Sequence, residues 1–260
     1  MTGILVAVDA TPAAEPVLRT AAVLGQALGW AVQALHVGAE PGPRDVADEL
    51  GLPLTVVDGD PEREVLATAE NSRADLVVVG MDPAPGPEQP GHMVDVLHHA
   101  LNAPLLVVPP SAPVRPAIRR VLFALDGSPS VAAAARPAMS MFSAAGLAVA
   151  ALHVFEPRTV PLFHDGAEDD AVWREEFLDQ NCAGLKVTLT TSAGPFVPAL
   201  LEAAAQADAD LIALPARPGT SLRGATVIRD VLVASDRPVV LVTASPHPVT
   251  GATAYSDPPA

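Results

Sequence analysis

Residues 74–109 read ADLVVVGMDPAPGPEQPGHMVDVLHHALNAPLLVVP, and this stretch decides the fold of the whole chain. The short Val-rich run at 76–79 is typical of a strand that is buried on both faces. A Pro-rich loop, a short amphipathic helix near 94–101 and a second apolar strand at 105–108 follow it. A loop at the carboxyl end of such a strand indicates a ligand crevice in an open α/β sheet.

The same pattern returns at 209–243 as ADLIALPARPGTSLRGATVIRDVLVASDRPVVLVT, which predicts two copies of one domain. Three landmark pairs measure the repeat: Asp9 and Asp126, His36 and His153, Asp75 and Asp210. The first two pairs are 117 residues apart and the third pair 135, which is 18 residues more. An insertion of that length is therefore predicted between the second and third strands of the second copy.

The predicted fold class is α/β, with two tandem Rossmann-like or flavodoxin-like domains, each a five-stranded parallel sheet flanked by helices. The first domain is expected at 1–109, a Pro-rich linker at 110–118 and the second domain at 119–244. The insertion covers about 158–183 with a helix around 171–181, and the tail at 245–260 is expected to be disordered. Thr11, followed by Pro12, is predicted to cap the first helix.

Each fifth strand, at 105–108 and at 239–242, is predicted to lie at the edge of its sheet. An open edge presents unpaired backbone groups and needs a cover. We therefore expect a cover over both edges.

The composition of the chain indicates which classes of partner and which cellular compartment are expected. A formal net charge of −15 and a single lysine, Lys186, argue against nucleic acid as a partner, because phosphate contacts need Lys and Arg. The single cysteine, Cys182, cannot form an internal disulfide, which favours a reducing compartment. No apolar run is long enough for a membrane span, and no signal peptide is recognisable, so a cytoplasmic location is expected.

Each half resembles the universal stress protein family. The resemblance lies in ILVAVDATP and VLFALDGSP at the two starts, in ALHV at the end of each second strand, and in the closing NAPLLVV and DRPVVLV. It implies a tandem member of the family whose halves cover each other as a pseudo-dimer, and a further pairing into a homodimer is favoured. In nucleotide-binding members, an Asp after strand one and a Val after strand two hold the nucleoside. A Gly-x2-Gly-x9-Gly-Ser/Thr loop binds the phosphates.

The first half matches part of this pattern. The resemblance assigns cofactor-binding roles to Asp9, Val37, Gly80, Gly91 and His92. Pro83 stands where the second Gly is expected, and the loop contains three further prolines, which remove amides from a phosphate cradle. Asp82 and Glu88 add negative charge to the loop.

The second half offers Asp126 and Val154, while Pro215 and Pro218 replace the first two glycines. Its loop is more favourable to an anion because it carries Arg residues, which bind phosphate bidentately. The candidate loop residues are Arg217, Gly219, Thr220, Arg223, Gly224, Ala225 and Thr226. The second crevice is therefore predicted to be the better site for a phosphate-bearing ligand. The candidate ligand is ATP or another adenine nucleotide, bound weakly. A solvated loop is the alternative.

Other polar residues have simpler explanations. Asp9 and Asp126 can cap the following helix, and His36 and His153 are expected to pack with one satisfied nitrogen. His92, Asp95 and His99 share a helical face that could hold a metal, but no metal site and no catalytic residue is predicted. The Walker loop and the Gly-x-Ser-x-Gly motif are absent from the sequence.

The predicted function is a non-enzymatic, cytoplasmic stress-response protein that binds a small nucleotide and has no nucleic-acid or membrane partner. Two alternatives stay open, a ligand-free scaffold for other proteins and a slow ATP hydrolase.

Overall fold

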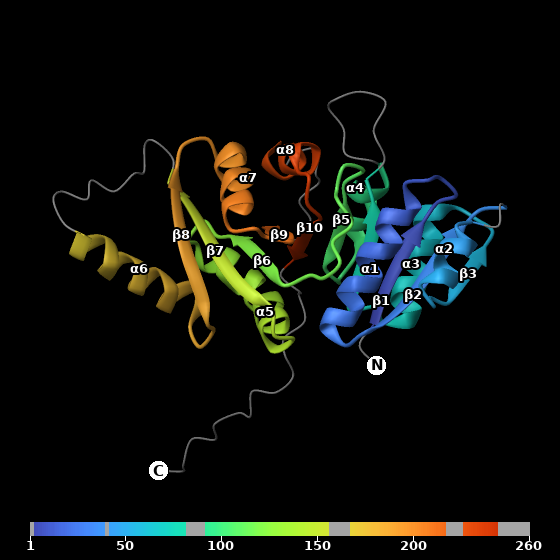
Figure 1. Ribbon diagram of the computed structural model, residues 1–260, viewed down its shortest axis with the longest axis horizontal. Helices are drawn as coiled ribbons and strands as arrows, with labels where there is room; N and C mark the ends of the chain where they lie inside the picture. The colour runs from blue at the N-terminus through green and yellow to red at the C-terminus, as the bar shows by residue number, and fades with distance from the viewer. Residues whose placement is uncertain (1–2, 40–41, 82–91, 156–166, 217–225, 244–260) are drawn as a thin grey trace, which may run out of the picture.

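The computed structural model describes residues 3–39, 42–81, 92–155, 167–216 and 226–243 (Figure 1). The first half runs β1 (Gly3–Val8), α1 (Ala14–Leu28), β2 (Ala31–Val37), α2 (Arg44–Glu49), β3 (Leu54–Val57), α3 (Pro61–Ser72), β4 (Leu76–Gly80), α4 (His92–Ala100) and β5 (Leu105–Val108). The second half repeats this order. It runs β6 (Arg120–Ala124), α5 (Pro129–Ala144), β7 (Ala148–Phe155), α6 (Ala167–Cys182), β8 (Val187–Ala193), α7 (Phe196–Gln206), β9 (Leu211–Ala216), α8 (Thr226–Ala234) and β10 (Val239–Thr243).

The strands form one sheet in the order β3-β2-β1-β4-β5-β10-β9-β6-β7-β8. Within each half all strand pairs are parallel, so the predicted α/β class with five parallel strands per half is confirmed. The fifth strands, β5 and β10, pair with each other in antiparallel fashion, with Leu106 opposite Val240. This pairing satisfies backbone groups that two separate sheets would leave exposed at their edges. The sequence pattern predicted a cover for these edges but not a continuous sheet.

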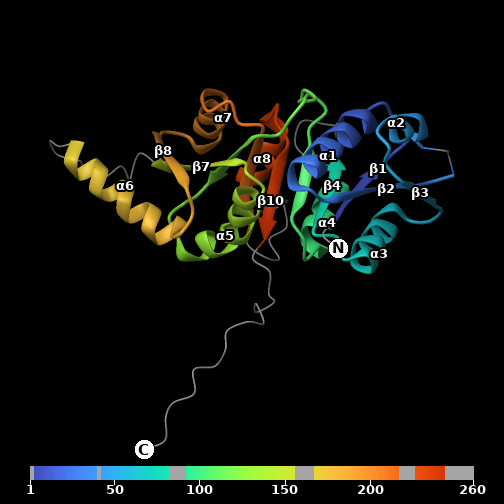
Figure 2. The ribbon, with the colours of Figure 1, turned by 60° about the horizontal axis from the view of Figure 1, so that its bottom comes forward.

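Helices cover both faces of this sheet (Figure 2). One core cluster joins the sheet to α1, α5 and α6 and includes Leu18, Phe142 and Phe177. The other joins it to α3, α4, α7 and α8 and includes Leu97 and Leu200. Residues of both halves contribute to each cluster. Burial of apolar surface, in addition to the pairing of β5 with β10, therefore holds the halves together.

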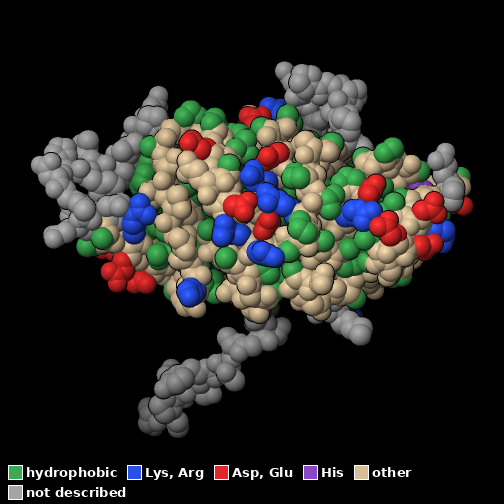
Figure 3. All heavy atoms as spheres, in the orientation of Figure 1, with side chains coloured by type: hydrophobic (Ala, Val, Ile, Leu, Met, Phe, Trp, Pro, Cys, Tyr) green, Lys and Arg blue, Asp and Glu red, His purple; other side chains and the backbone are tan. Residues whose placement is uncertain are grey.

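The linker between the halves packs against the second half. Residues 109–119 contain no helix or strand, as the prolines predict, but Ala112 and Ile118 are buried. Arg115 forms ion pairs with Asp208 at 3.3 Å and Asp210 at 3.8 Å. Basic and acidic side chains intermingle near the middle of the face shown in Figure 3. The linker is thus part of the packed body.

The insertion forms α6, which spans the helix predicted around 171–181. It occupies the position between second and third strands that the short α2 occupies in the first half. In Figure 1 α6 lies beyond β8, at the end of the sheet. Arg174 donates to the backbone carbonyl of Leu189 and the hydroxyl of Thr191, so α6 is tied to the outer strand β8.

None of the helices within the described ranges has both the length and the apolar composition needed to cross a membrane. The predicted disordered tail at 245–260 lies outside the described residues.

Candidate ligand crevices

The topology places one crevice in each half. In the first half β1 pairs with β2 on one side and with β4 on the other, so successive crossovers leave the sheet in opposite directions. Ligands of open α/β sheets bind outside the carboxyl ends of the strands at such a switch point. The second half has its switch point between β6 and β9. Because β5 and β10 are antiparallel, the carboxyl ends of the two halves point in opposite directions at the junction.

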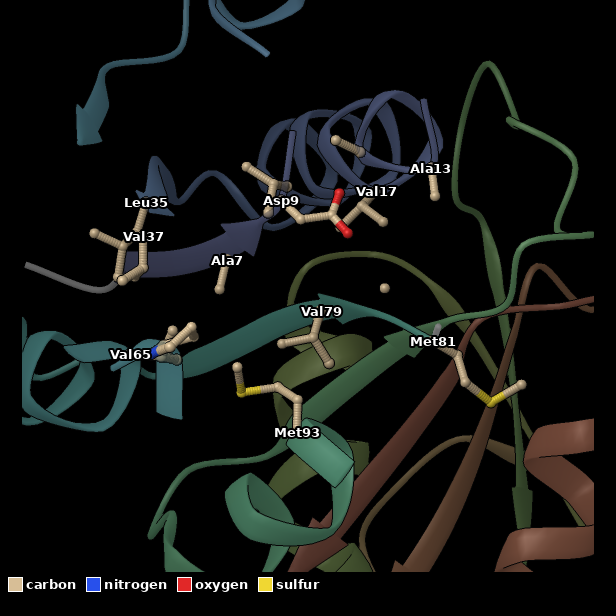
Figure 4. Close-up of a pocket in the computed structure, with 14 residues that line it drawn as sticks. Ala7, Asp9, Ala13, Val17, Leu35, Val37, Val65, Val79, Met81 and Met93 are labelled. Atoms are coloured by element: carbon tan, nitrogen blue, oxygen red, sulfur yellow. The ribbon is translucent and has the colours of Figure 1, made fainter. Parts of the chain in front are cut away.

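The first crevice has a volume of about 240 Å³ and lies at the carboxyl ends of β1, β2 and β4 (Figure 4). Asp9, Val37 and Gly80, which the resemblance assigned to ligand binding, all line it. A Cβ atom added to Gly80 would lie 3.1 Å from Cγ2 of Val17. Gly80 therefore allows α1 to approach β4 closely at this point.

Asp9 forms a local turn at the mouth of this crevice. Its Oδ1 accepts hydrogen bonds from the amide of Thr11 at 2.9 Å and from the Thr11 hydroxyl at 2.7 Å. The predicted helix cap at Thr11 is wrong, because α1 begins at Ala14 and its N-cap residue Ala13 provides no side-chain cap. The turn between Asp9 and Thr11 uses the residues that would otherwise start the helix.

Of the other two candidates of the first half, His92 is described and does not line the crevice. Nε2 of His92, the first residue of α4, lies 3.1 Å from a carboxylate oxygen of Glu62, and its side chain is largely exposed. The next residue, Met93, lines the crevice instead. Gly91 lies outside the described residues. Across the described ranges, no three His, Cys, Asp or Glu side chains are grouped closely enough to hold a metal ion.

The helix α4 also carries a buried histidine, His98, that the sequence patterns did not single out. Burial lowers the pKa of His98 below its ordinary value of about 6.5, while Asp95 acts to raise it and His99 to lower it further. The folded state then binds fewer protons than the unfolded state once the pH falls below about 6.5. Stability is therefore lost as the pH falls from that value toward the lowered pKa.

We expect His98→Leu to reduce this acid sensitivity, because Leu232 occupies the equivalent position in α8. Urea unfolding between pH 7 and pH 5 measures the effect. The matched control is His99→Gln on the exposed side of α4, which removes only the smallest of the three contributions to the pKa of His98 and should keep most of the parent's pH dependence. An unchanged slope in His98→Leu would show that another group causes the acid sensitivity.

The second crevice is larger, at about 440 Å³, and occupies the equivalent place at the ends of β6, β7 and β9. Asp126 and Val154 line it, as does Pro215, which stands where the first half has Gly80. Oδ1 of Asp126 accepts a hydrogen bond from the amide of Ser128 at 2.8 Å. Ser128 in turn caps α5, so the helix does not need Asp126 as its direct cap.

Most of the loop predicted to bind phosphate lies outside the described residues, namely Arg217, Gly219, Thr220, Arg223, Gly224 and Ala225. Thr226 is the exposed first residue of α8 and does not line the crevice, whereas Val227 and Ile228 do. Phe196, the first residue of α7, supplies an aromatic wall that the sequence patterns did not identify. Its counterpart in the first crevice is Pro61.

His36 and His153 occupy equivalent positions but different surroundings. Nδ1 of each ring hydrogen-bonds to a backbone carbonyl, His36 to Val8 at 3.0 Å and His153 to Leu125 at 2.9 Å. His36 is buried and its Nε2 has no hydrogen-bond partner among the described residues. His153 lines the second crevice.

The ring of His153 belongs to an aromatic cluster that the insertion completes. Its centroid lies 4.6 Å from that of Phe155, 5.5 Å from Trp173 and 5.0 Å from Phe177. Trp173 and Phe177 come from α6, so the insertion forms part of the wall behind the second crevice. Only the three-dimensional structure shows this, because the residues are separated in sequence by the whole β7–α6 connection.

Comparison with known proteins agrees with this geometry. Residues 117–243 match the model of the universal stress protein family. The second half of the chain is therefore similar to the universal stress protein family. The first half has the same strand order and a crevice at the same place, which extends the likeness to a tandem arrangement. No curated protein sequence matches the chain significantly.

Solved structures with both halves in one chain share the fold. A universal stress protein from Archaeoglobus fulgidus DSM 4304 is 18% identical, with a TM-score of 0.65, over 93% of this chain and 98% of that one. A functionally unknown protein from Pseudomonas aeruginosa PAO1 is 16% identical, with a TM-score of 0.68, over 94% of this chain and 92% of that one. At these identities the likeness concerns the fold. The universal stress protein domain at 117–243 therefore sits in a two-part architecture that other proteins also have.

Proposed function

We propose that this protein is a non-enzymatic, cytoplasmic stress-response protein of the universal stress protein family and that it binds an adenine nucleotide in its second crevice. The observation that carries the proposal is the second crevice itself, about 440 Å³ in volume and placed at the switch point with Asp126 and Val154 at the strand ends. Ligand pockets in proteins are typically about 300–1,000 Å³. This crevice falls within that range, whereas the first crevice falls below it.

The lining of the second crevice suits a nucleoside. Phe196 and Val227 offer apolar surface for a purine ring, and the carboxylate of Asp126 can accept a hydrogen bond from a ribose hydroxyl. The loop after β9 contains Arg217 and Arg223, which favour a phosphate group. Pro215 lacks an amide, so the expected affinity is weak, with a Kd on the order of tens of micromolar or higher.

The non-enzymatic part of the proposal rests on the sequence. It contains no phosphate-loop Lys and no evident general base or pair of Mg²⁺-binding carboxylates, which phosphoryl transfer requires. We propose that the protein acts through other proteins, with the nucleotide as the signal.

Calorimetric titration of ATP into the parent protein and two double variants tests the proposal. We expect Asp126→Ala with Arg223→Ala to abolish the binding heat, and Asp9→Ala with Gly80→Val to retain it. The opposite pattern would place the nucleotide in the first crevice, and no heat from the parent would favour a ligand-free scaffold. Release of phosphate during the titration would instead support a slow ATP hydrolase.

A further inference from the structure

We infer that the first crevice binds a different class of small molecule, a compact aromatic ring carrying one cationic group such as a primary ammonium. This inference goes beyond nucleotide binding and does not depend on it. Four features of the crevice point to this class of ligand: its size, the apolar side chains in its walls, its methionines and its charge.

The size of the crevice suits a single ring. Its volume is about 240 Å³, little more than half that of the second crevice at about 440 Å³. An apolar cavity of about 150 Å³ is large enough to hold benzene. The first crevice therefore accommodates one six-membered ring with a short side chain, whereas a nucleoside triphosphate is much larger.

Aliphatic side chains form most of its walls. Val17 of α1, Val37 of β2, Val65 of α3 and Val79 of β4 surround the space from four different elements. Figure 4 shows these four valines around the same space as Ala7. Walls of this kind favour burial of an apolar group and provide no hydrogen bonds to a sugar or a phosphate.

Two methionines, Met81 and Met93, also line the crevice, one after β4 and one at the start of α4. A thioether is flexible and polarizable and makes favourable contacts with the edge of an aromatic ring. Among its described lining residues the second crevice has no methionine, and Val227 occupies the position equivalent to Met93. The methionines therefore distinguish the first crevice and favour an aromatic ligand.

The charge of the crevice selects a cation. Among the described residues that line it, Asp9 is the single charged side chain. Its Oδ1 already accepts two hydrogen bonds from Thr11, while Oδ2 accepts none from the described residues and remains available to a donor. Figure 4 shows the carboxylate between α1 and β4, over the crevice. An ammonium group on the ligand pairs with this oxygen, whereas a carboxylate or phosphate is repelled.

The neighbouring charges act in the same direction. Glu62 and Glu64 lie in the first turn of α3, next to the lining residue Pro61. Arg63 belongs to the same turn but is exposed and does not line the crevice. The sequence has no Lys or Arg between Arg73 and Arg115, the stretch that includes β4 and α4.

Methyl NMR of the full-length protein provides a direct test, because the chain contains only five methionines. The protein is labelled with ¹³C at the methionine methyl groups and titrated with 2-phenylethylamine at pH 7. We expect the signals of Met81 and Met93 to shift with a Kd on the order of 1 mM, while Met139, which is buried in the core, stays unchanged. The neutral analogue 2-phenylethanol should bind about three times more weakly, and phenylacetate should cause no shift.

Variants of the protein separate the contribution of the Asp9 charge to ligand binding from that of the crevice volume. Asp9→Asn should weaken binding of the amine about threefold and leave 2-phenylethanol unaffected, because Asp9 is exposed and its ion pair is screened. Ala7→Leu should fill the crevice and abolish both shifts, while the matched change Ala124→Leu in the second crevice should leave them intact. Thermal unfolding of each variant controls for loss of the fold.

Three outcomes would overturn the inference. They are binding of phenylacetate as tight as that of the amine, shifts of Met81 and Met93 that ATP produces and the amine does not, or shifts that persist in Ala7→Leu. Failure of the nucleotide proposal is distinguishable from failure of this one. If the nucleotide proposal alone fails, titration with ATP gives no binding heat, while 2-phenylethylamine still shifts the signals of Met81 and Met93.

Discussion

Val240→Asp should remove about 3–5 kcal/mol or more of the free energy of unfolding, which is a large part of the stability of a typical protein. Val240 lies in β10 opposite Leu106 of β5, at the pairing that joins the halves, and its exposed fraction is 0%. A carboxylate there would lie in the apolar cluster between the sheet and the helices α1 and α5, whose buried members carry no cation. Either it stays charged in an apolar environment or it takes up a proton, and both cost stability.

The matched control is Val56→Asp in β3, the end strand of the described sheet, where the parent residue is 37% exposed. This change should cost less than about 1 kcal/mol because the new carboxylate remains in water. Urea unfolding followed by circular dichroism measures both variants. We also expect Val240→Asp to separate the unfolding of the halves into two transitions. Equal losses in the two variants would mean that the junction contributes no more than an edge strand.

Trp173→Ala should lower the free energy of unfolding by about 2–3 kcal/mol. Replacing a fully buried Phe or Trp by Ala lowers the free energy of unfolding by about 3–5 kcal/mol. Trp173 is only partly buried, so we expect a smaller loss. Its ring centroid lies 5.0 Å from that of Phe155 and 5.1 Å from that of Phe177, so the indole bridges β7 and α6. Without it, α6 loses its ring contact with Phe155 of β7, and the wall behind His153 is weakened.

Val172→Ala is the control for this change, because Val172 is the preceding residue of α6 and its side chain is 56% exposed. It should alter stability by no more than about 0.5 kcal/mol. Thermal and urea unfolding compare the two variants, and size-exclusion chromatography reports any change in oligomeric state. A loss in Trp173→Ala as small as that in Val172→Ala would show that the insertion is not anchored by its tryptophan.

The sequence predicted the repeated elements well because each depends on local patterns. Apolar runs such as 76–79 and 105–108 are short and rich in Val and Leu, as strands buried on both faces require. The start of α1 was not predicted correctly, because the local sequence Thr11-Pro12 is typical of a helix start. The hydrogen bonds that Thr11 donates to Asp9 form a turn that delays the start of α1. This turn depends on where β1 ends.

The candidate sites were predictable only in part. The crevice positions of four residues could be inferred from the order of the strands that the repeat aligns, because these residues lie at or just beyond the strand ends: Asp9, Val37, Asp126 and Val154. Phe196 and His153 were not identified as lining residues, because a helix start and a buried-looking histidine have many commoner explanations. The phosphate-loop residues such as Arg217 and Arg223 stay predictions.

The sequence by itself determined the α/β class, the duplication and the position of the insertion. Each of these follows from periodicity and spacing along one chain, which need no knowledge of distant contacts. The tertiary structure alone decided that β5 and β10 pair into one sheet, that the two crevices differ in volume, and that α6 packs on His153. These depend on how surfaces far apart in sequence fit together, because a strand edge, a crevice wall and an aromatic cluster are each completed by side chains or backbone from other elements.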